Sequence, residues 1–426
     1  MTTAMENGLA GRCEGILEKA LGSPLPIGLR MWDGSRTGPS DAPTLSVRSN
    51  RALRHLLWCP GELGLARAYV MGEIDVDGDL RQALGLCRRF VRSLRAAGRV
   101  SLPRLSMLGA LALRLGAIGS PPRVPAEEAR LTGRLHSVRR DGDAIAHHYD
   151  LGNEFYQAIL DPSMAYSCAY WSSGTHRLAD AQRDKLDLVC RKLGLGPGKR
   201  LLDIGCGWGP LVLHAARNYG VRATGVTISA QQHGFVQSRI RADAIGDAVD
   251  VRLQDYRDAT GGPFDAVASI EMGEHVGEAN YARYAETLRT LVRPGGRVLI
   301  QQMSRGSVAP GGGAFIEAYI APDMTMRPLH RTLGYIEAAS LEIREVVSLR
   351  EHYVRTIDAW STRLDEVWDD IVRRHGVRRA RIWRLYLAGS ALAFEENRMS
   401  VHQILAVRPT SDGLSEMPIG DGVADR

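Results

Sequence analysis

A strand, a glycine-rich turn and a helix succeed one another in RLLDIGCGWGPLVLHAARNYG, residues 200–220, and this succession constrains the fold most strongly. The apolar run Leu201–Ile204 leads into GCGWG and then into a helical pattern. Glycines let the backbone approach a ligand closely, and the first turn of a helix offers N–H groups without intrahelical partners. The stretch therefore predicts a βα unit of a doubly wound α/β sheet, with a ligand at the carboxyl end of the strand.

Two details of this unit separate the nucleotide ligands that such a turn can hold. The glycines are spaced GxGxG and not GxGxxG, and Asp203 lies directly before them, where it can accept from the ammonium of S-adenosylmethionine. The next strand, VRATGVTIS, ends at Thr227 and lacks the acid that grips the ribose of NAD. Further on, VRLQDYRD places Asp255 and Tyr256 where an adenine can be hydrogen-bonded and stacked. These contrasts favour S-adenosylmethionine over NAD.

The bulk composition limits the class of protein. A chain of 426 residues is too long for one hydrophobic core, so we expect two or three domains. The hydrophobic content of 44% and charged content of 24% are typical of globular proteins. Six scattered cysteines without a CxxC pair predict neither a disulfide framework nor a zinc site. The net charge of +6 comes almost wholly from arginine, which suits phosphate recognition but also follows from a bias in base composition.

The pattern along the chain predicts four regions. Residues 1–90 alternate short extended runs with helical patterns, as a small α+β domain does. Residues 91–140 form a basic amphipathic linker, and residues 141–407 alternate strand and helix patterns, as a catalytic domain with a parallel sheet does. The polar, glycine-rich residues 408–426 predict a disordered tail.

The basic stretch has two interpretations, which the sequence leaves open. Between residues 88 and 140, twelve arginines accompany only two acids, Glu127 and Glu128, and the pattern predicts basic amphipathic helices broken at Pro103. Such helices suit an anionic membrane surface, but a solvated linker helix packed on the protein explains them equally well. Nucleic-acid binding is not favoured, because no aromatic interleaving or recognition motif accompanies the charge.

No targeting or membrane-spanning segment is expected. The first residues lack the apolar region of a signal peptide, and the apolar stretch 107–119 is too short to cross a bilayer. We therefore expect a cytoplasmic protein, either soluble or peripherally associated with the inner face of the membrane.

A set of further motifs resembles one family. The motifs are AIAHHYDLGNEFYQAILDPSMAYSCAYW, LLDIGCGWG, GVTISAQQ, QDYRD, SIEMGEHVGEANY and HYVRTIDAW. From about residue 140 to 407 the chain is similar to cyclopropane-fatty-acyl-phospholipid synthases and their mycolic-acid relatives. The resemblance implies a Rossmann-like class I S-adenosylmethionine-dependent methyltransferase fold, preceded by the smaller α+β domain. It also implies methyl transfer to a cis double bond of unsaturated phospholipid acyl chains, through a carbocation.

The resemblance also implies roles for individual residues. Cys168, Glu274 and Tyr353 match positions that in the family surround a bound bicarbonate ion, which serves as the base. We expect Glu274 and Tyr353 to stabilise the developing positive charge. The expected cofactor-binding residues are Tyr166, Ser167, Gly205, Gly207, Thr227, Gln232 and Tyr256, with Ser229 from the GVTISAQQ motif and with Asp203 and Asp255 from the strand ends.

The stretch LIQQM, residues 299–303, departs from the family pattern. A helix pattern, a Pro-Gly-Gly turn and an apolar run precede it, so it predicts a strand that delivers Gln301, Gln302 and Met303 to a sheet end. The family has LLHTI here, and Gln301 therefore stands for the His and Met303 for the Ile. An amide cannot carry charge, although it keeps a donor and an acceptor, so bicarbonate would be held differently.

Two products follow from one cation. Immediate proton loss from the added methyl group closes a cyclopropane, whereas a preceding hydride shift gives an exocyclic methylene, the precursor of a 10-methyl branch. The missing His favours the methylene product. A cyclopropane synthase is the alternative, and a non-catalytic lipid-binding protein is the third hypothesis.

The expected partners follow from this chemistry. They are unsaturated phospholipid acyl chains and a membrane surface, and the sequence is also compatible with a homodimer and with a flavin- or nicotinamide-dependent reductase that acts on the product. The sequence leaves the double-bond position, the acyl carrier and the oligomeric state open.

Overall fold

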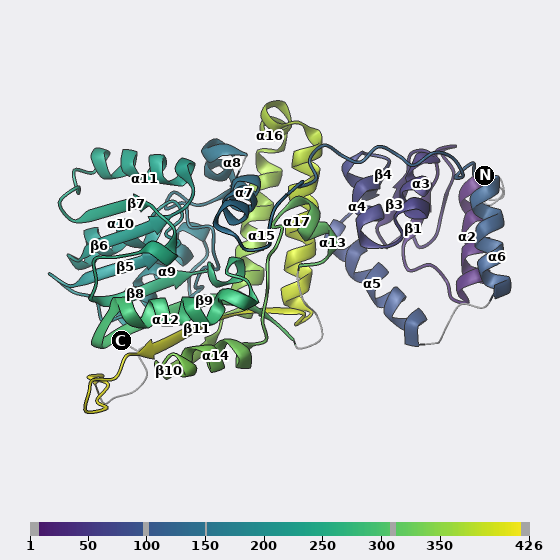
Figure 1. Ribbon diagram of the computed structural model, residues 1–426. Helices are drawn as coiled ribbons and strands as arrows, with labels where there is room; N and C mark the ends of the chain where they lie inside the picture. Colours follow the sequence, from purple (N-terminus) through teal and green to yellow (C-terminus); the bar gives the residue numbers. More distant parts are fainter. Residues whose placement is uncertain (1–7, 97–101, 150, 307–311, 419–426) are drawn as a thin grey trace. The chain divides into compact units, whose positions relative to one another are not determined.

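Two units, each with its own sheet, make up the chain in the computed structural model (Figure 1). The structure describes residues 8–96, 102–149, 151–306 and 312–418. Unit 1 comprises Met1–Glu128 and Trp368–Leu392, and unit 2 comprises Ala129–Val367 and Ala393–Arg426. Each unit is therefore made of segments that lie far apart in the sequence.

Unit 1 is an α+β unit around a four-stranded sheet with the order β2-β1-β3-β4. β1 runs parallel to β3, and the other neighbours are antiparallel. Side chains such as Cys13, Leu29 and Val47 meet in its core. The elements are α2 (Leu9–Leu21), β1 (Gly28–Arg30), β2 (Arg36–Thr37), β3 (Thr44–Val47), α3 (Arg51–Trp58), α4 (Glu62–Val70), β4 (Ile74–Asp77), α5 (Leu80–Ala96), α6 (Leu102–Arg114), α16 (Trp368–His375) and α17 (Val377–Glu395), the last of which runs on into unit 2.

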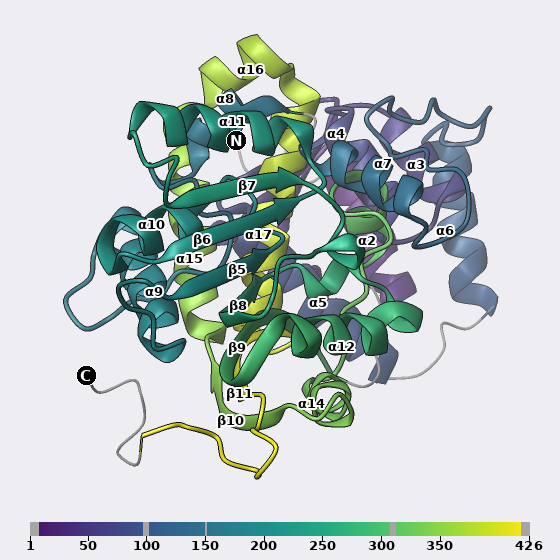
Figure 2. The ribbon, with the colours of Figure 1, turned by 60° about the vertical axis from the view of Figure 1, so that its left-hand side comes forward.

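Unit 2 is a seven-stranded sheet with the order β10-β11-β9-β8-β5-β6-β7, of which Figure 2 shows the strands side by side. Neighbouring strands are parallel from β9 to β7, whereas β11 runs antiparallel to both β9 and β10. The chain passes from β5 outward to β7 and then returns to the other side of β5 with β8. The carboxyl ends of β5 and β8 therefore meet at a topological switch point, where open α/β sheets bind ligands. The strands are β5 (Arg200–Ile204), β6 (Arg222–Thr227), β7 (Val249–Leu253), β8 (Phe264–Ile270), β9 (Val292–Arg305), β10 (Glu342–Ser348) and β11 (Met399–Val407).

Helices cover both faces of this sheet, and the strand sequences follow from that burial. Leu201 packs with α9, α10 and α11, whereas its neighbour Leu202 packs on the opposite face with α12 and α14. Because successive side chains point to opposite faces, a strand buried on both sides is apolar at nearly every position, as LLDI is. The helices of unit 2 are α7 (Val138–Tyr149), α8 (Gly152–Ile159), α9 (Leu178–Lys192), α10 (Pro210–Tyr219), α11 (Ala230–Ala242), α12 (Tyr281–Leu291), α13 (Ala314–Tyr319), α14 (Leu329–Ala338) and α15 (Arg350–Glu366).

The predicted strand that carries Gln301 is β9. Its Gln301 pairs with Ile270, the last residue of β8, and with Gln403 of β11. The expected Pro-Gly-Gly turn is instead an irregularity within β9, where the register with β8 shifts between Phe264 and Ala266. Gly295, at a φ of 72°, accommodates this irregularity.

The observed unit boundaries differ from the predicted regions. The stretch 91–140 is not a separate linker, because Leu111 of α6 belongs to the core of unit 1 and Glu128 pairs with Arg67 at 2.7 Å. Residues 368–392 join unit 1, although we predicted them within the catalytic domain. Pro103 lies in the first turn of α6, where proline is tolerated, and does not break a helix.

The predicted tail is ordered over its described part. The Arg408 backbone N–H donates to Gly296 O at 3.0 Å, and the Gly295 N–H donates to Arg408 O at 2.7 Å. The carboxylate of Glu416 binds Arg293 at 3.0 Å. Residues 419–426 of this prediction lie outside the described residues. Within the part of the chain that the structure describes, none of the helices combines the length and the apolar run that a bilayer crossing requires.

Candidate active site

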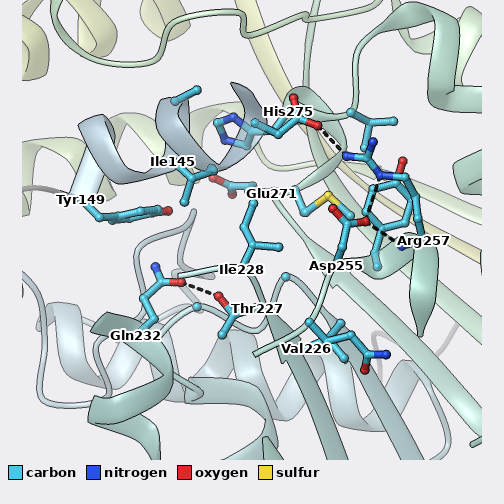
Figure 3. A pocket seen from close by; sticks show the side chains of 18 of the residues that line it. Ile145, Tyr149, Val226, Thr227, Ile228, Gln232, Asp255, Arg257, Glu271 and His275 are labelled. Atoms are coloured by element: carbon cyan, nitrogen blue, oxygen red, sulfur yellow. Dashed lines mark hydrogen bonds and ion pairs between the residues drawn. The ribbon is translucent and has the colours of Figure 1, made fainter. Parts of the chain in front are cut away.

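A cavity opens at the switch point of unit 2, beside the glycine turn that follows β5 (Figure 3). Gly205 has a φ of 78°, and a Cβ atom there would lie 2.7 Å from Met272 Cγ. This position therefore requires glycine, both for its left-handed backbone conformation and because the Met272 side chain lies so close to its Cα atom. The cavity is lined by Asp141, Ala144, Ile145, Tyr149, Gly205, Gly207, Val226, Thr227, Ile228, Gln232, Gln254, Asp255, Tyr256, Arg257, Glu271, Met272, His275, Val276, Pro322 and Asp323.

Polar groups from three strand ends hold opposite sides of the cavity. The Thr227 hydroxyl donates to Gln232 Oε1 at 2.9 Å, and Asp255 Oδ1 accepts from the Arg257 side chain at 2.9 Å. Figure 3 shows these two pairs on different sides of the cavity, with Glu271 above the Thr227–Gln232 pair. The Tyr256 hydroxyl is buried without a hydrogen-bond partner.

Asp203 supplies a test of whether the turn fits an aminocarboxypropyl group. Its Oδ1 is buried and lacks a hydrogen-bond partner, and burial raises its pKa to about 7, an effect that Lys185 opposes. A buried carboxylate oxygen without a donor is costly, and an ammonium group from a ligand would satisfy it. The site therefore fits S-adenosylmethionine.

The predicted cofactor residues divide into two groups. Gly205, Gly207, Thr227, Gln232, Asp255 and Tyr256 line the cavity. Asp203, Tyr166, Ser167 and Ser229 do not, and three of these four have structural contacts instead. Ser229 caps α11 by accepting from the Gln232 N–H, Ser167 accepts from the Lys185 ammonium at 3.0 Å, and the Tyr166 ring lies 5.2 Å from that of Trp360.

Three of the five predicted catalytic residues meet around a carboxylate that the sequence analysis did not single out, that of Glu271. Its Oε1 accepts from the Cys168 backbone N–H at 2.8 Å and from Gln301 Nε2 at 2.8 Å. Its Oε2 accepts from the Tyr353 hydroxyl at 2.6 Å. Glu271 also lines the cofactor cavity, so this cluster and the cavity share a wall.

Gln301 is held in one orientation by its neighbours. Its side chain is fully buried, and its Oε1 accepts from Gln403 Nε2 at 2.9 Å. Its Nε2 therefore faces Glu271 and also donates to Cys168 O at 3.2 Å. A flipped amide would place its NH2 against the Gln403 donor and its oxygen against the two acceptors, Cys168 O and Glu271 Oε1.

Cys168 contributes its backbone rather than its thiol to this cluster. Its Sγ donates to Ala169 O and Leu349 O, at 3.3 and 3.6 Å. Burial raises the pKa of the thiol well above its usual value, so the thiol stays protonated. The contact of this residue with the cluster is its backbone N–H, which donates to Glu271.

Glu274 and Met303 contact each other and not Glu271. The Met303 backbone N–H donates to Glu274 Oε1, and Glu274 Oε2 is buried without a hydrogen-bond partner. Burial, and next the charge of Glu271, raise the pKa of Glu274 to about 8. Near pH 7 Glu274 therefore carries a proton, and it is not the ionised group of the pair.

Glu271 itself has an unusual backbone conformation. Its φ is 51°, a left-handed value that costs a residue with a side chain roughly 1–3 kcal/mol. Its N–H donates to Gln301 O at 2.7 Å, which helps to hold the strained residue in place. Strain of this kind clusters at functional sites.

A buried lysine supplies the positive charge near this cluster. Lys185 of α9 is 1% exposed, and its Nζ donates to Ser167 Oγ at 3.0 Å. Burial lowers its pKa, whereas the charges of Glu271, Asp161 and Asp203 raise it. Lys185 thus offsets the carboxylates on both sides of the site.

Sequence reasoning missed Glu271, Lys185 and Gln403. The motif SIEMGEHVG does contain a signal for Glu271, because it places an acid directly at the carboxyl end of a strand, but the family resemblance points to Glu274 in the same motif. Lys185 and Gln403 carry no comparable signal, because they become relevant only when α9 and β11 pack beside the site.

Comparison with known proteins agrees with the family that the sequence motifs predict. The family model for mycolic acid cyclopropane synthetase matches residues 136–404. A Mycobacterium tuberculosis protein named "Probable fatty acid methyltransferase" is 38% identical over 404 residues, which cover 92% of this chain and 94% of that protein. The cyclopropane-fatty-acyl-phospholipid synthase of Escherichia coli (strain K12) is 34% identical over 315 residues, which cover 73% of this chain and 81% of that enzyme.

A solved structure extends the comparison to the cofactor. The crystal structure of a mycolic acid cyclopropane synthase complexed with SAH and CTAB matches with a TM-score of 0.59 at 28% identity. The match covers 62% of this chain and 97% of that one. The predictions of the family, of the class I methyltransferase fold and of S-adenosylmethionine as cofactor are confirmed. The chain belongs to the mycolic acid cyclopropane synthetase family, as an enzyme that uses S-adenosylmethionine to modify lipid acyl chains.

Proposed function

We propose that this enzyme methylates the cis double bond of an unsaturated phospholipid acyl chain and releases a methylene fatty acyl product. The observation that carries the proposal is Gln301, buried at the sheet end where the family resemblance implies a His. Its amide is held by Gln403 on one side and by Glu271 on the other. The cluster beside the cavity therefore contains no imidazole from this strand.

The residues of the site would divide the work as follows. Gly205 and Gly207 would let the cofactor lie against the turn, and Thr227 and Tyr256 would border its nucleoside, since all four line the cavity. Asp203 lies behind the lining, directly before the turn, and its buried Oδ1 without a hydrogen-bond partner would attract the ammonium group. S-adenosylmethionine supplies the methyl group when it is bound. Alignment of two reacting groups in a closed site saves roughly 7–11 kcal/mol of the barrier.

The product depends on which step follows methyl transfer. A hydride shift is internal to the acyl chain and needs no protein group, whereas ring closure needs a base at once. A base that several hydrogen bonds hold in place can remove the methyl proton only when that proton reaches it. The hydride shift can occur before this happens. The missing imidazole therefore supports the methylene product over the cyclopropane.

The names of the relatives support lipid acyl chains as the substrate. The relative that aligns over 92% of the chain is named as a fatty acid methyltransferase, and the cyclopropane synthase that aligns over 73% is named for acyl phospholipids. A phospholipid substrate requires access to a membrane surface. The exposed Arg89, Val91 and Arg95 of α5 would suit an anionic one.

The test is the structure of the product. The enzyme is incubated with vesicles of an oleoyl phospholipid and S-adenosylmethionine, and the released fatty acids are analysed by mass spectrometry before and after ozonolysis. The two products have the same mass, but only the methylene compound is cleaved to a ketone. A product that resists ozonolysis would identify the cyclopropane synthase alternative, and no lipid product at all would contradict both.

A further inference from the structure

Glu271 occupies the position that the family resemblance gives to bicarbonate. Three of the five groups expected around that ion, the Cys168 backbone, the residue at position 301 and Tyr353, donate to the Glu271 carboxylate, whereas the other two, Glu274 and Met303, contact each other. These donors are already satisfied, so the residues present do not fit a bicarbonate ion between them. We propose that Glu271 is the base that removes the proton from the added methyl group, and that the enzyme works without bicarbonate. This inference rests on the proposed methyl transfer to an acyl double bond.

The carboxylate retains one acceptor position for the incoming proton. A carboxylate has four lone-pair sites, and three are used, two on Oε1 and one on Oε2. The remaining site is on the oxygen that binds Tyr353. Glu271 also lines the cofactor cavity together with Gly205 and Tyr149, so the base borders the space where the methyl group is delivered (Figure 3).

The backbone supports a functional rather than an incidental placement. Glu271 has a φ of 51°, where glycine is the residue that fits without strain. A glutamate at this position gains three hydrogen bonds to its side chain and one from its N–H to Gln301 O. The strained backbone conformation of Glu271 thus goes together with a carboxylate that is held in one orientation.

The surrounding charges favour an ionised Glu271. Burial raises its pKa, whereas Tyr353, the Cys168 N–H, Gln301 and the Lys185 ammonium oppose that rise. The neighbouring carboxyl of Glu274 has its pKa raised to about 8, so it holds its proton at pH 7. Of the two acids, Glu271 is the one that is hydrogen-bonded for accepting a proton, and a raised pKa makes it a better base near neutral pH.

The proton transfer balances without any further reactant. The C–H bond of the added methyl group breaks, and the proton moves to Glu271 Oε2. The electron pair of that bond forms the exocyclic C=C bond and neutralises the cation, or forms the ring bond in the cyclopropane alternative. Glu271 becomes a neutral acid and returns its proton to water after the product leaves.

The test compares wild type with Glu271→Gln and Glu271→Gly in buffer freed of carbon dioxide, with and without added bicarbonate. The release of S-adenosylhomocysteine and of modified lipid from oleoyl phospholipid vesicles is measured. Glu271→Gln keeps the shape and can still accept from Cys168 and Gln301, but its NH2 group can only donate to the Tyr353 oxygen. The variant loses the basicity, so turnover should fall roughly 10²–10⁴-fold while cofactor binding persists. Wild-type turnover should be equal with and without bicarbonate. Glu271→Gly vacates the position, so added bicarbonate should restore part of its activity.

The matched control is Glu345→Gln, which removes a carboxylate on the edge strand β10 that is paired with the buried Lys192 at 3.0 Å and not with a residue of the Glu271 cluster. Its turnover should match wild type, and calorimetry with S-adenosylmethionine verifies that each variant is folded. Wild-type turnover that requires bicarbonate, an active Glu271→Gln or a Glu271→Gly variant that bicarbonate does not rescue would each overturn the inference and leave the proposed function standing. No lipid product from wild type under either condition would overturn the proposed function itself, and the inference with it.

Discussion

Gln301→His reintroduces an imidazole into the cluster, and it should shift the product towards cyclopropane. Gln301 donates one hydrogen bond to the charged Glu271 carboxylate, and such a bond contributes about 1.5–3 kcal/mol. A tenfold change in the ratio of two products needs a difference of only about 1.4 kcal/mol between their barriers. A change at this single contact is therefore large enough to move the methylene-to-cyclopropane ratio by about tenfold or more.

Gln301→His should also lower the free energy of unfolding, because it removes hydrogen bonds in a buried cluster. The amide of Gln301 makes three hydrogen bonds, to Cys168 O, to Glu271 and from Gln403. An imidazole has two nitrogens, so at least one buried partner is left unsatisfied, at a cost of roughly 1–3 kcal/mol. Domains commonly have 5–15 kcal/mol of stability, so we expect a folded variant with a lower midpoint in urea.

The assay for this prediction is product analysis after ozonolysis, beside urea unfolding and calorimetry with S-adenosylmethionine. Gln302→Asn is the matched control, because Gln302 is buried on the opposite face of β9, where it accepts from the Tyr281 hydroxyl. The control should lose stability without a change in product ratio. A folded Gln301→His variant that binds the cofactor and gives the wild-type ratio would refute the reasoning.

Three further predictions concern the cofactor and the membrane. Burial raises the pKa of Asp203 to about 7, so the carboxyl is neutral below that pH and charged above it. Calorimetry should show S-adenosylmethionine binding that strengthens as the pH rises through 7, and Asp203→Asn should remove this dependence; pH-independent binding by wild type would contradict the role. Gly205→Ala places a Cβ atom 2.7 Å from Met272 Cγ at a φ of 78°, so thermal unfolding should show a loss of roughly 1–2 kcal/mol, with weaker cofactor binding; an unchanged variant would mean that the turn yields. Combining Arg89→Gln with Arg95→Gln should weaken co-sedimentation with anionic vesicles by on the order of 1 kcal/mol per residue and leave neutral vesicles unaffected; equal binding to anionic vesicles would place the contact elsewhere.

The sheet and the cofactor turn could be predicted from the sequence because their signals are local. The strand, the glycines and the helix of residues 200–220 are contiguous, and the next strand, VRATGVTIS, brings Thr227 to the same edge of the sheet. The prediction of a strand that carries Gln301 was equally local, and its pairing with Ile270 places Gln301 beside the carboxyl end of β8, although β9 itself continues to Arg305.

The unit boundaries could not be predicted, because they depend on packing between distant segments. The stretch 91–140 is rich in arginine, yet Leu111 packs into the core of unit 1. The composition of an amphipathic helix averages its exposed and its apolar faces. It therefore does not indicate which part of the protein packs against the apolar face. Residues 368–392 join the same unit from the far end of the chain.

Glu271 could not be singled out for a similar reason. Its partners Cys168, Gln301 and Tyr353 come from three elements that are more than a hundred residues apart at their extremes. Its left-handed φ is also not visible in the sequence. The sequence shows two acids in SIEMGEH, and only the hydrogen bonds show which of them faces the donors.

The measurement that tests the central claim most directly follows the hydride shift itself. Wild-type enzyme is incubated with S-adenosylmethionine and a phospholipid whose acyl chain carries deuterium on both alkene carbons, and the product is analysed by NMR. We predict vinylidene proton signals and a deuterium moved onto the neighbouring carbon, so that this carbon carries two. A product with cyclopropane ring protons and one deuterium retained on each original carbon would contradict the account.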